Sequence, residues 1–201
     1  MKWLAPVLPY LAVAIGIFWI QNALAALLSF HVAIILSLLF VRSQVPIKIL
    51  FKSRDIRWVI LNVLLCGGSG VSLYLFWSTF EVIGNLSAHV ESFGLTRTTW
   101  PIFIIYFVLV NPLIEEYFWR GYLGSPTRRL HPSDFLYSGF HGLILLGKME
   151  IAAVFFSLIV LVLAGWFWRQ IARADDGLLA PVLGHMAADF TILMAIYLRA
   201  A

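Results

Sequence analysis

Long apolar stretches, separated by short polar segments, run through the whole chain. A transmembrane helix needs roughly 20 consecutive apolar residues, and seven stretches reach or approach this length. They cover residues 3–21, 24–41, 58–77, 100–123, 135–147, 151–168 and 178–198. The pattern predicts an all-α fold, a polytopic membrane helix bundle with about seven transmembrane segments.

The first and fifth stretches differ from the others. The apolar run 3–20 resembles a signal peptide, but it exceeds the roughly 7 to 15 residues of a signal core, so we expect a retained first span. Residues 135–147 are short for a span and fit a re-entrant or protein-buried helix. No Gly/Ser-rich linker or internal repeat divides the chain, and we expect residues 1–201 to form a single integral-membrane domain.

Composition agrees with a membrane location. Hydrophobic residues make up 62% of the chain and charged residues 12%, against roughly 25% charged residues in soluble domains. We interpret the net charge of +4 as a topology signal, and we expect no nucleic-acid partner. The single cysteine, Cys66, excludes an intramolecular disulfide.

The positions of lysine and arginine predict the orientation. With the N-terminus in the cytoplasm, ten of these residues lie inside and three outside, as the positive-inside rule requires. The inside group is Lys2, Arg42, Lys48, Lys52, Arg54, Arg57, Arg128, Arg129, Arg169 and Arg173. Segment 42–57 would then lie on the cytoplasmic surface, partly as an interfacial helix. The C-terminus would lie outside, and we expect a bacterial or archaeal cytoplasmic membrane.

Three polar motifs interrupt the apolar stretches between residues 111 and 189. They contain Glu115, Glu116 and Arg120, then Tyr137 and His141, then His185 and Asp189. Ionisable groups at membrane depth are expensive and usually mark function. At about 1.5 Å per residue, Glu115, His141 and His185 lie roughly 9 to 12 Å from the cytoplasmic ends of their helices. Three separate segments therefore bring polar groups to one level.

Helical spacing separates the roles of these residues. Glu116 and Arg120 are four residues apart with the acid first, so they pair along one helix face. Glu115 points about 100° away from Glu116, and a buried carboxylate without a cation is an effective general base. We therefore expect Glu115 to be the base. His185 and Asp189 are also four residues apart, so the carboxylate would orient the imidazole.

Residues outside the motifs are interpreted as structural. His31 is expected to make an interhelical hydrogen bond, and Gly67, Gly68 and Gly70 to let helices approach closely or to break the third span. Helix caps are expected at Ser133 or Asp134 and at Asp175 or Asp176. Interfacial anchors are expected at Trp58, Trp77, Trp100, Trp166 and Trp168.

The three motifs together resemble a known family. Glu-Glu-x-x-x-Arg at 115–120, aromatic-x-x-x-His at 137–141 and His-x-x-x-Asp at 185–189 follow one another on successive apolar segments. This order resembles the CAAX protease and bacteriocin-processing family, also called the Abi family, of glutamate-type intramembrane endopeptidases. The resemblance covers about half of the chain, residues 100–195, and any one motif alone would be weak.

The resemblance implies peptide hydrolysis within the membrane. Glu115 would activate a water molecule with His141, while His185 and Asp189 would hold that water or stabilise the oxyanion. No cofactor is implied. The implied partners are the lipid bilayer and a membrane-embedded or lipid-anchored peptide or protein substrate, cleaved near the cytoplasmic face.

Supporting roles and departures from the family pattern follow from the same match. Glu116 and Arg120 would keep the site in shape. Tyr137 stands where the family usually has Phe, and its hydroxyl is expected near a catalytic group as a hydrogen-bond partner. Asp189 stands where the eukaryotic prenyl-protease branch usually has Asn, so specificity for prenylated substrates stays open.

Alternatives to a metal-free peptidase also stay open. Glu115, His141 and His185 form the ligand set of a catalytic zinc centre or of another divalent metal, with Asp189 as an orienting partner. The zincin pattern of two histidines four residues apart on one helix is absent. The scaffold also suits a non-catalytic immunity or binding protein, or an ion or proton transporter. Transport predicts polar groups at several depths, whereas these lie at one level.

Overall fold

The computed structural model describes residues 2–80 and 84–200 and contains no strand in these ranges. The α-helices are α1 (Val7–Ile15), α2 (Ala23–Phe40), α3 (Ile56–Leu75), α4 (Leu86–Ser92), α5 (Trp100–Glu116), α6 (Pro132–Leu145), α7 (Ile151–Asp175) and α8 (Leu179–Ala200). Shorter helices are η1 (Lys2–Leu4), η3 (Ile47–Phe51) and η4 (Trp77–Phe80), and the π-helices are η2 (Gly16–Ile20) and η5 (Tyr117–Tyr122). The predicted all-α fold is confirmed.

Within the described ranges, six helical stretches are long and apolar enough to cross a membrane. They are Lys2–Ile20, Ala23–Phe40, Ile56–Leu75, Trp100–Tyr122, Ile151–Asp175 and Leu179–Ala200. The predicted fifth stretch corresponds to α6, whose 14 residues extend over about 21 Å at 1.5 Å per residue. This is less than the roughly 30 Å of a bilayer core. The count of seven crossings therefore stays a prediction.

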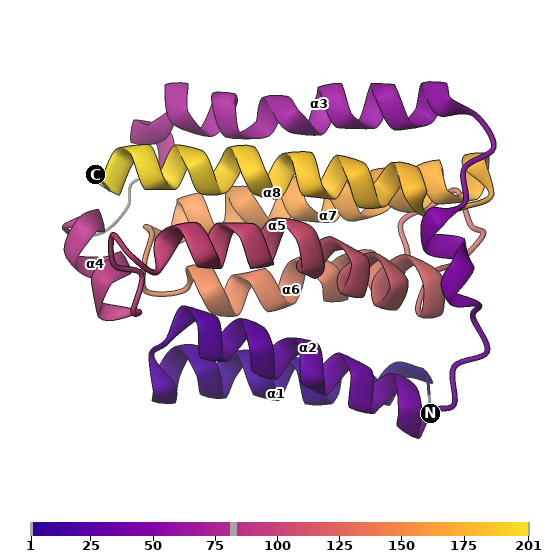
Figure 1. Ribbon diagram of the computed structural model, residues 1–201, viewed down its shortest axis with the longest axis horizontal. Coiled ribbons are helices and arrows are strands. Elements are labelled where there is room, and N and C mark those ends of the chain that lie inside the picture. Colours follow the sequence, from indigo (N-terminus) through magenta and orange to yellow (C-terminus); the bar gives the residue numbers. More distant parts are fainter. Residues whose placement is uncertain (1, 81–83, 201) are drawn as a thin grey trace.

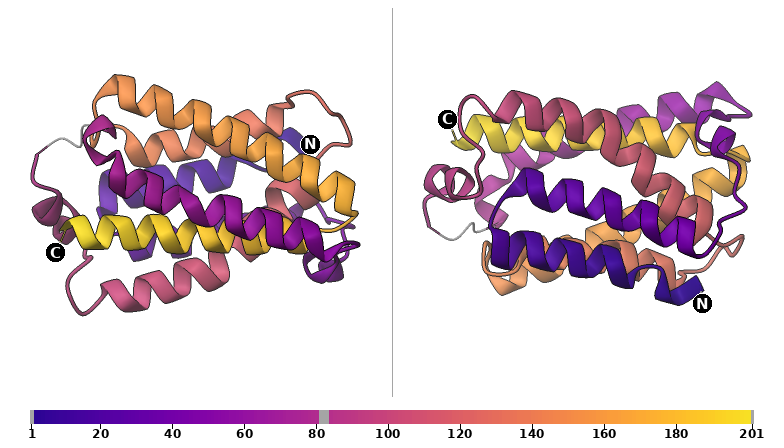
Figure 2. Two further views of the ribbon diagram at one scale, coloured as in Figure 1. Left: turned by 90° about the horizontal axis from the view of Figure 1, so that it is seen from above. Right: turned by 60° about the horizontal axis from the view of Figure 1, so that its bottom comes forward.

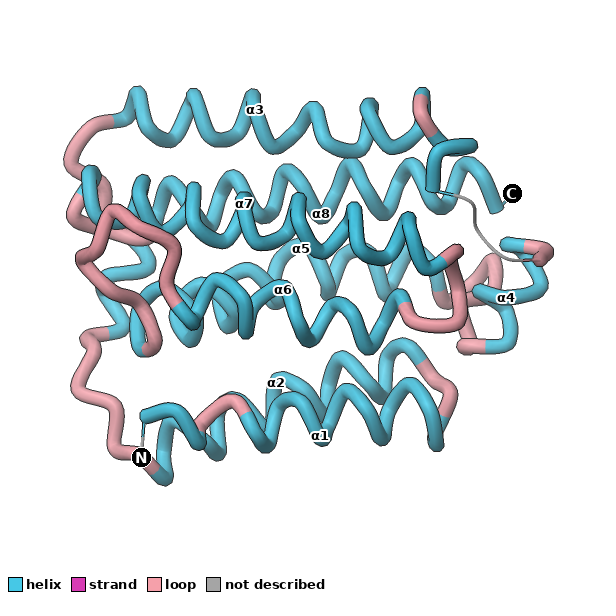
Figure 3. The backbone as a smooth tube through the Cα atoms, turned by 180° about the vertical axis from the view of Figure 1, so that it is seen from behind, coloured by secondary structure: helices cyan, strands magenta, loops and turns pink. Residues whose placement is uncertain are grey.

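The helices run along one common axis, with the N-terminus and the C-terminus at opposite ends of the bundle (Figure 1). α1 and α2 form one side, α3 and α8 lie on the other, and α5, α6 and α7 lie between them. Helices α3 and α8 pack against each other along their length, as two further views show (Figure 2). The loops after α2, η5 and α7 gather at the end that carries the N-terminus (Figure 3). This end is the one that the basic residues predict to be cytoplasmic.

Close packing of α3 against α8 depends on a glycine. A Cβ atom at Gly70 would clash with the backbone of Thr191, so only hydrogen fits there. Gly67 is less constrained, since its Cβ atom would lie 3.8 Å from Ala187. The prediction of close helix approach is confirmed at Gly70, and the third span is unbroken from Ile56 to Leu75.

The segment before α3 fixes the start of α8. The amides of Leu178 and Leu179 donate to the carbonyls of Ile49 and Lys52 at 2.9 and 3.1 Å. The predicted caps of this helix are wrong, because α7 extends to Asp175 and ends at Asp176 in the left-handed conformation. The first amides of α8 find backbone carbonyls instead of a side-chain cap. The predicted interfacial helix in segment 42–57 is only the five-residue 3-10 helix η3.

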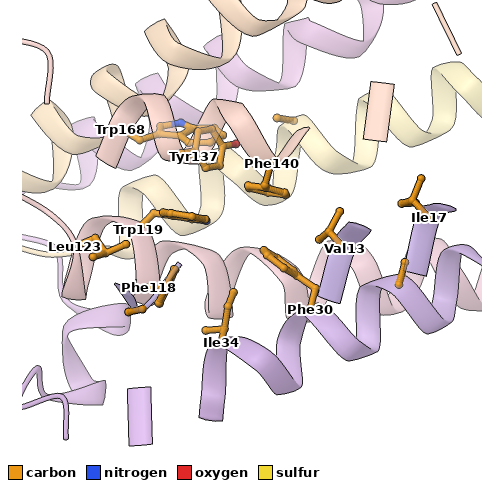
Figure 4. Close-up of a cluster of buried hydrophobic side chains, with 13 residues drawn as sticks. Val13, Ile17, Phe30, Ile34, Phe118, Trp119, Leu123, Tyr137, Phe140 and Trp168 are labelled. Carbon is orange, nitrogen blue, oxygen red and sulfur yellow. The ribbon is translucent and has the colours of Figure 1, made fainter. Parts of the chain in front are cut away.

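Aromatic side chains connect the N-terminal pair of helices to the rest of the bundle (Figure 4). Phe30 of α2 stacks on Phe140 of α6 with ring centroids 4.9 Å apart. Phe140 also stacks on Trp119 of η5 at 5.7 Å with nearly parallel rings. Stacked aromatic pairs of this kind add roughly 0.5–1.5 kcal/mol to the effect of burial. Helix α2 is thereby fixed against the helices that carry the polar motifs.

The orientation can be tested by cysteine labelling. In a Cys66→Ser background, single cysteines at Lys48 of η3 and Ala200 of α8 should react from opposite sides of the membrane, because η3 and the C-terminal end of α8 lie at opposite ends of the bundle. A membrane-impermeant maleimide applied to right-side-out and inverted vesicles measures this. Labelling of both positions from the same side would contradict the predicted topology.

Candidate active site

The first motif lies where α5 changes into a π-helix. Glu115 and Glu116 are the last two residues of α5, and Arg120 lies within η5. Pro112 precedes them inside the helix and lacks the N–H group that a regular turn requires. π-helical turns occur frequently at functional sites. The irregular backbone thus coincides with the cluster of charged residues.

Glu116 joins two helices through one carboxylate oxygen. Its Oε1 accepts hydrogen bonds from Arg120 Nη1 at 3.0 Å and from His185 Nδ1 at 2.8 Å. The side chain of Glu116 is fully buried, and those of Arg120 and His185 are 2% and 3% exposed. The predicted pairing of Glu116 with Arg120 is confirmed, and its bond to His185 connects α5 to α8.

His185 is held from three sides. Its Nδ1 contacts Glu116, and its Nε2 lies 3.5 Å from Asp189 Oδ1. Trp168 of α7 stacks on the imidazole with centroids 4.5 Å apart. Because both ring nitrogens face carboxylate oxygens, both are placed as hydrogen-bond donors. The predicted proximity of His185 and Asp189 is confirmed.

Tyr137 and His141 lie on α6, one helical turn apart. His141 Nδ1 contacts the carbonyl oxygen of Tyr137 at 2.9 Å. A carbonyl only accepts, so Nδ1 carries the hydrogen and the lone pair of a neutral ring resides on Nε2. The ring of Tyr137 lies 4.9 Å from that of His141 and 6.2 Å from that of His185, and the Arg120 guanidinium lies 4.0 Å from its centroid. Tyr137 thus lies between the residues of the three motifs.

The hydroxyl of Tyr137 does not make the expected hydrogen bond to a catalytic candidate. Among residues 2–80 and 84–200, it forms no hydrogen bond with a catalytic candidate, although the ring is buried. The tyrosine contributes its aromatic face, on which the Arg120 guanidinium lies. Cation–π contacts of this kind are worth roughly 0.5–2 kcal/mol depending on desolvation.

Glu115 has different surroundings from Glu116. It is 2% exposed, and within the described part of the chain it forms no ion pair. Its Oε2 atom is buried and has no hydrogen-bond partner among the described residues. Glu116 is engaged with Arg120, and His185 lies between Glu116 and Asp189, so Glu115 is left as the carboxylate without a cation. This agrees with the separation of roles that helical spacing predicts.

One buried polar residue that sequence reasoning did not assign to the site contacts it, and a second contacts that residue. Asn111 Nδ2 donates to Asp189 Oδ2 at 3.3 Å, and Asn111 Oδ1 lies 3.0 Å from His31 Nε2. His31 Nδ1 in turn lies 3.0 Å from the Tyr106 hydroxyl. The predicted interhelical role of His31 is confirmed. Asn111 had a visible signal, since it is a lone amide in an apolar stretch one turn before Glu115.

Trp168 was also missed. It is only 4% exposed and contacts both His185 and Arg120, so its prediction as an interfacial anchor is wrong. Trp100 is likewise 4% exposed and packs on Phe103, so it is a core residue. Trp168 was misplaced because α7 extends to Asp175, seven residues beyond the predicted end, whereas Trp100 does begin its helix but is buried there by packing.

A second buried ion pair holds the loop before α6. Arg169 binds Asp134 through two hydrogen bonds of 2.9 and 2.7 Å, and it also donates to carbonyls of loop 125–129. The cap of α6 is His131, with Asp134 at the third helical position in a capping box, so the predicted cap at Ser133 or Asp134 is wrong. Asp134 instead accepts from the His131 amide and from Arg169. The ion pair fixes where α6 begins and therefore where His141 lies.

A metal ion does not fit these side chains well. Over the described ranges, no group of three or more His, Cys, Asp or Glu residues is arranged to hold an ion. Of the three candidate ligands, His185 directs both nitrogens at carboxylates. A ligating histidine needs one nitrogen for the metal. The donor set therefore favours hydrogen bonding over metal ligation.

Comparison with known proteins agrees with the motifs. A family model described as type II CAAX prenyl endopeptidase Rce1-like matches residues 97–191. This segment contains all three polar motifs, and the resemblance to the CAAX protease family is confirmed for it. No curated protein and no solved structure matches the chain. The structure and the family together define an integral membrane protein with a CAAX protease-like segment.

Glu116 is expected to stabilise the fold. Glu116→Gln leaves Arg120 and His185 without their shared counter-charge, and breaking such a buried pair costs about 3 to 5 kcal/mol. We expect a lower melting temperature and a lower yield of folded protein in detergent. The exposed Glu91→Gln variant is the control, and a melting temperature of Glu116→Gln equal to that of the control would contradict this role.

Proposed function

We propose that the protein is a glutamate-type intramembrane endopeptidase that cleaves a membrane-associated or lipidated protein or peptide near the cytoplasmic face. The family match of residues 97–191 supports an endopeptidase. The observation that carries the mechanism is the difference between two adjacent buried carboxylates. Both carboxylates have an Oε2 atom without a hydrogen-bond partner among the described residues, but Glu116 Oε1 accepts from Arg120 and His185, whereas Glu115 forms no ion pair in this part of the chain.

Glu115 is the general base in this proposal. It takes a proton from a water molecule, and the oxygen of that water forms a bond to the carbonyl carbon of the peptide. His141 assists, because its Nδ1 is held by the Tyr137 carbonyl and its Nε2 lone pair accepts the second hydrogen bond of the water. Protonated Glu115 then returns the proton to the leaving amine nitrogen as the C–N bond breaks. No other reactant is consumed.

His185 stabilises the oxyanion. Its Nδ1 is anchored to Glu116 at 2.8 Å, whereas its Nε2 lies 3.5 Å from Asp189, beyond the usual hydrogen-bond distance. The Nε2–H group is thus the weakly held donor, and without any rotation of the ring it is available to the negative charge that develops on the carbonyl oxygen. Asp189 keeps the ring oriented, and Trp168 supports its face.

The location of the site supports a substrate reached from the cytoplasm. Glu115 and His185 lie in those halves of α5 and α8 that are nearer the basic end of the bundle. Suitable substrates are the C-terminus of a lipidated protein, a leader peptide or a transmembrane anchor. Asp189 stands where prenyl proteases usually have Asn, so the proposal does not include a requirement for a prenyl group.

Removal of the base should abolish cleavage without unfolding the protein. Glu115→Gln keeps size and hydrogen-bonding capacity and removes basicity, so cleavage per folded molecule should fall by about 10²-fold or more. Quantitative mass spectrometry of protein termini in membranes with wild-type or variant protein identifies the substrate, and peptides from its cleavage site are then tested with purified protein. Exposed Glu150→Gln is the control. Wild-type cleavage by Glu115→Gln would overturn the assignment.

Cleavage should not depend on a metal ion. The proposed base, orienting groups and oxyanion donor are all side chains, so the initial rate on the identified peptide should be unchanged after exhaustive treatment with EDTA and phenanthroline. A loss of rate that added Zn²⁺ restores would instead establish the metal centre that Glu115, His141 and His185 would form.

A further inference from the structure

Helices α5 and α8 are connected by two polar contacts, about one helical turn apart. The first joins Glu116 to His185 at 2.8 Å, and the second joins Asn111 to Asp189 at 3.3 Å. On α8, His185 and Asp189 are four residues apart and contact each other. The two contacts therefore hold the catalytic imidazole and its carboxylate partner from the same neighbouring helix.

A further side chain, Arg120 in one case and His31 in the other, supports each of these contacts. Arg120 holds Glu116 at 3.0 Å, and His31 of α2 holds Asn111 at 3.0 Å. His31 is 2% exposed and Asn111 is 1% exposed, so both side chains are shielded from bulk solvent. Unpaired polar groups at such a depth are costly. The second support lies outside the segment 97–191 that the family model matches.

The direction of every hydrogen bond in this chain follows from its neighbours. The Asp189 carboxylate accepts, so Asn111 presents its NH₂ group to Asp189 and its oxygen to His31. His31 must then donate from Nε2, and its Nδ1 accepts from the Tyr106 hydroxyl at 3.0 Å. The result is a chain of hydrogen bonds in which each group donates to the next, from Tyr106 through His31 and Asn111 to Asp189, which contacts His185.

We infer that His31 is a positioning residue of the active site, which acts through Asn111 on Asp189 and thereby sets the orientation of His185. This inference rests on the proposed function for its catalytic consequence, but the geometry that it predicts can be measured without a substrate. Without the amide of Asn111, one oxygen of Asp189 loses its donor, and the carboxylate rotates freely relative to the imidazole. Partners that orient metal-ligating histidines change activity about 10- to 100-fold when removed, and we expect a loss of the same order here.

The variants are chosen to separate positioning from packing. His31→Leu removes the donor, whereas His31→Gln places an amide N–H near the position of Nε2 and restores the bond to Asn111. Asn111→Leu breaks the same chain of hydrogen bonds between His31 and Asp189. Ser37→Ala is the matched control, because Ser37 is also buried on α2, six residues from His31, and its hydroxyl has no partner among the described residues.

The first measurement is the ring ¹⁵N spectrum of the full-length protein labelled at histidine, in detergent, with the His185 signals assigned by His185→Gln. We expect the His185 signals to move in His31→Leu and Asn111→Leu, and to stay at the wild-type position in His31→Gln and Ser37→Ala. Unmoved His185 signals in His31→Leu would overturn the inference. This outcome is independent of whether the protein cleaves any peptide.

The second measurement is kcat per folded molecule on the peptide identified by terminal mass spectrometry. We expect His31→Leu and Asn111→Leu to lower kcat about 10- to 100-fold with little change in KM, and the double variant to lose no more than either single variant. Rescue by His31→Gln is part of the expectation. A wild-type kcat in His31→Leu, or additive losses in the double variant, would overturn the inference.

A third variant covers the case in which His31→Leu does not fold. Tyr106→Phe removes only the hydroxyl that holds His31 Nδ1, and Tyr106 is half-buried. The His185 signals should still move, by less than in Asn111→Leu, and unmoved signals would overturn the inference. If wild-type protein and Glu115→Gln both fail to cleave any terminus, the proposed function fails, while the spectra still decide the role of His31.

Discussion

The carboxylate of Glu116 makes the contacts on which the candidate active site depends. It is fully buried and binds both Arg120 and His185, so it connects the π-helical end of α5 to α8. A buried ion is costly unless it is paired and hydrogen-bonded. Glu116 is paired through Oε1, which accepts from two donors, while its Oε2 has no partner among the described residues. The same contact fixes the angle between the helix that carries Glu115 and the helix that carries His185.

Adjacent glutamates can have opposite roles because a helix turns by about 100° per residue. That rotation directs Glu116 toward Arg120 and His185 and directs Glu115 elsewhere, with one oxygen that has no partner among the described residues. A carboxylate surrounded by donors is a weak base, whereas a buried one without a cation is a strong one. A motif match alone assigns both residues to a site, and it is the set of ion pairs and hydrogen bonds that distinguishes the proposed base from its structural neighbour.

Local rules in the sequence predicted much of the fold and of the site. Apolar length predicted the helices, and the four-residue spacing predicted the Glu116–Arg120 and His185–Asp189 pairs, because these depend only on helix geometry. Contacts that depend on packing were not predictable. Asn111 lies 80 residues from His31, and Trp168 lies 17 residues before His185 on another helix. The cap of α6 was misplaced because Asp134 accepts hydrogen bonds from Arg169 and from the His131 amide, while His131 itself is the cap.

The contact between α2 and α5 extends the site beyond its sequence motifs. Phe30 and His31 are neighbours on α2, and one stacks on Phe140 of the helix that carries His141 while the other binds Asn111 of the helix that carries Glu115. A single turn of α2 therefore contacts both helices that provide the groups proposed to activate water. Neither residue belongs to the segment 97–191, so the motifs contain the proposed reacting groups, and the proposed positioning of those groups depends on contacts from the N-terminal helices.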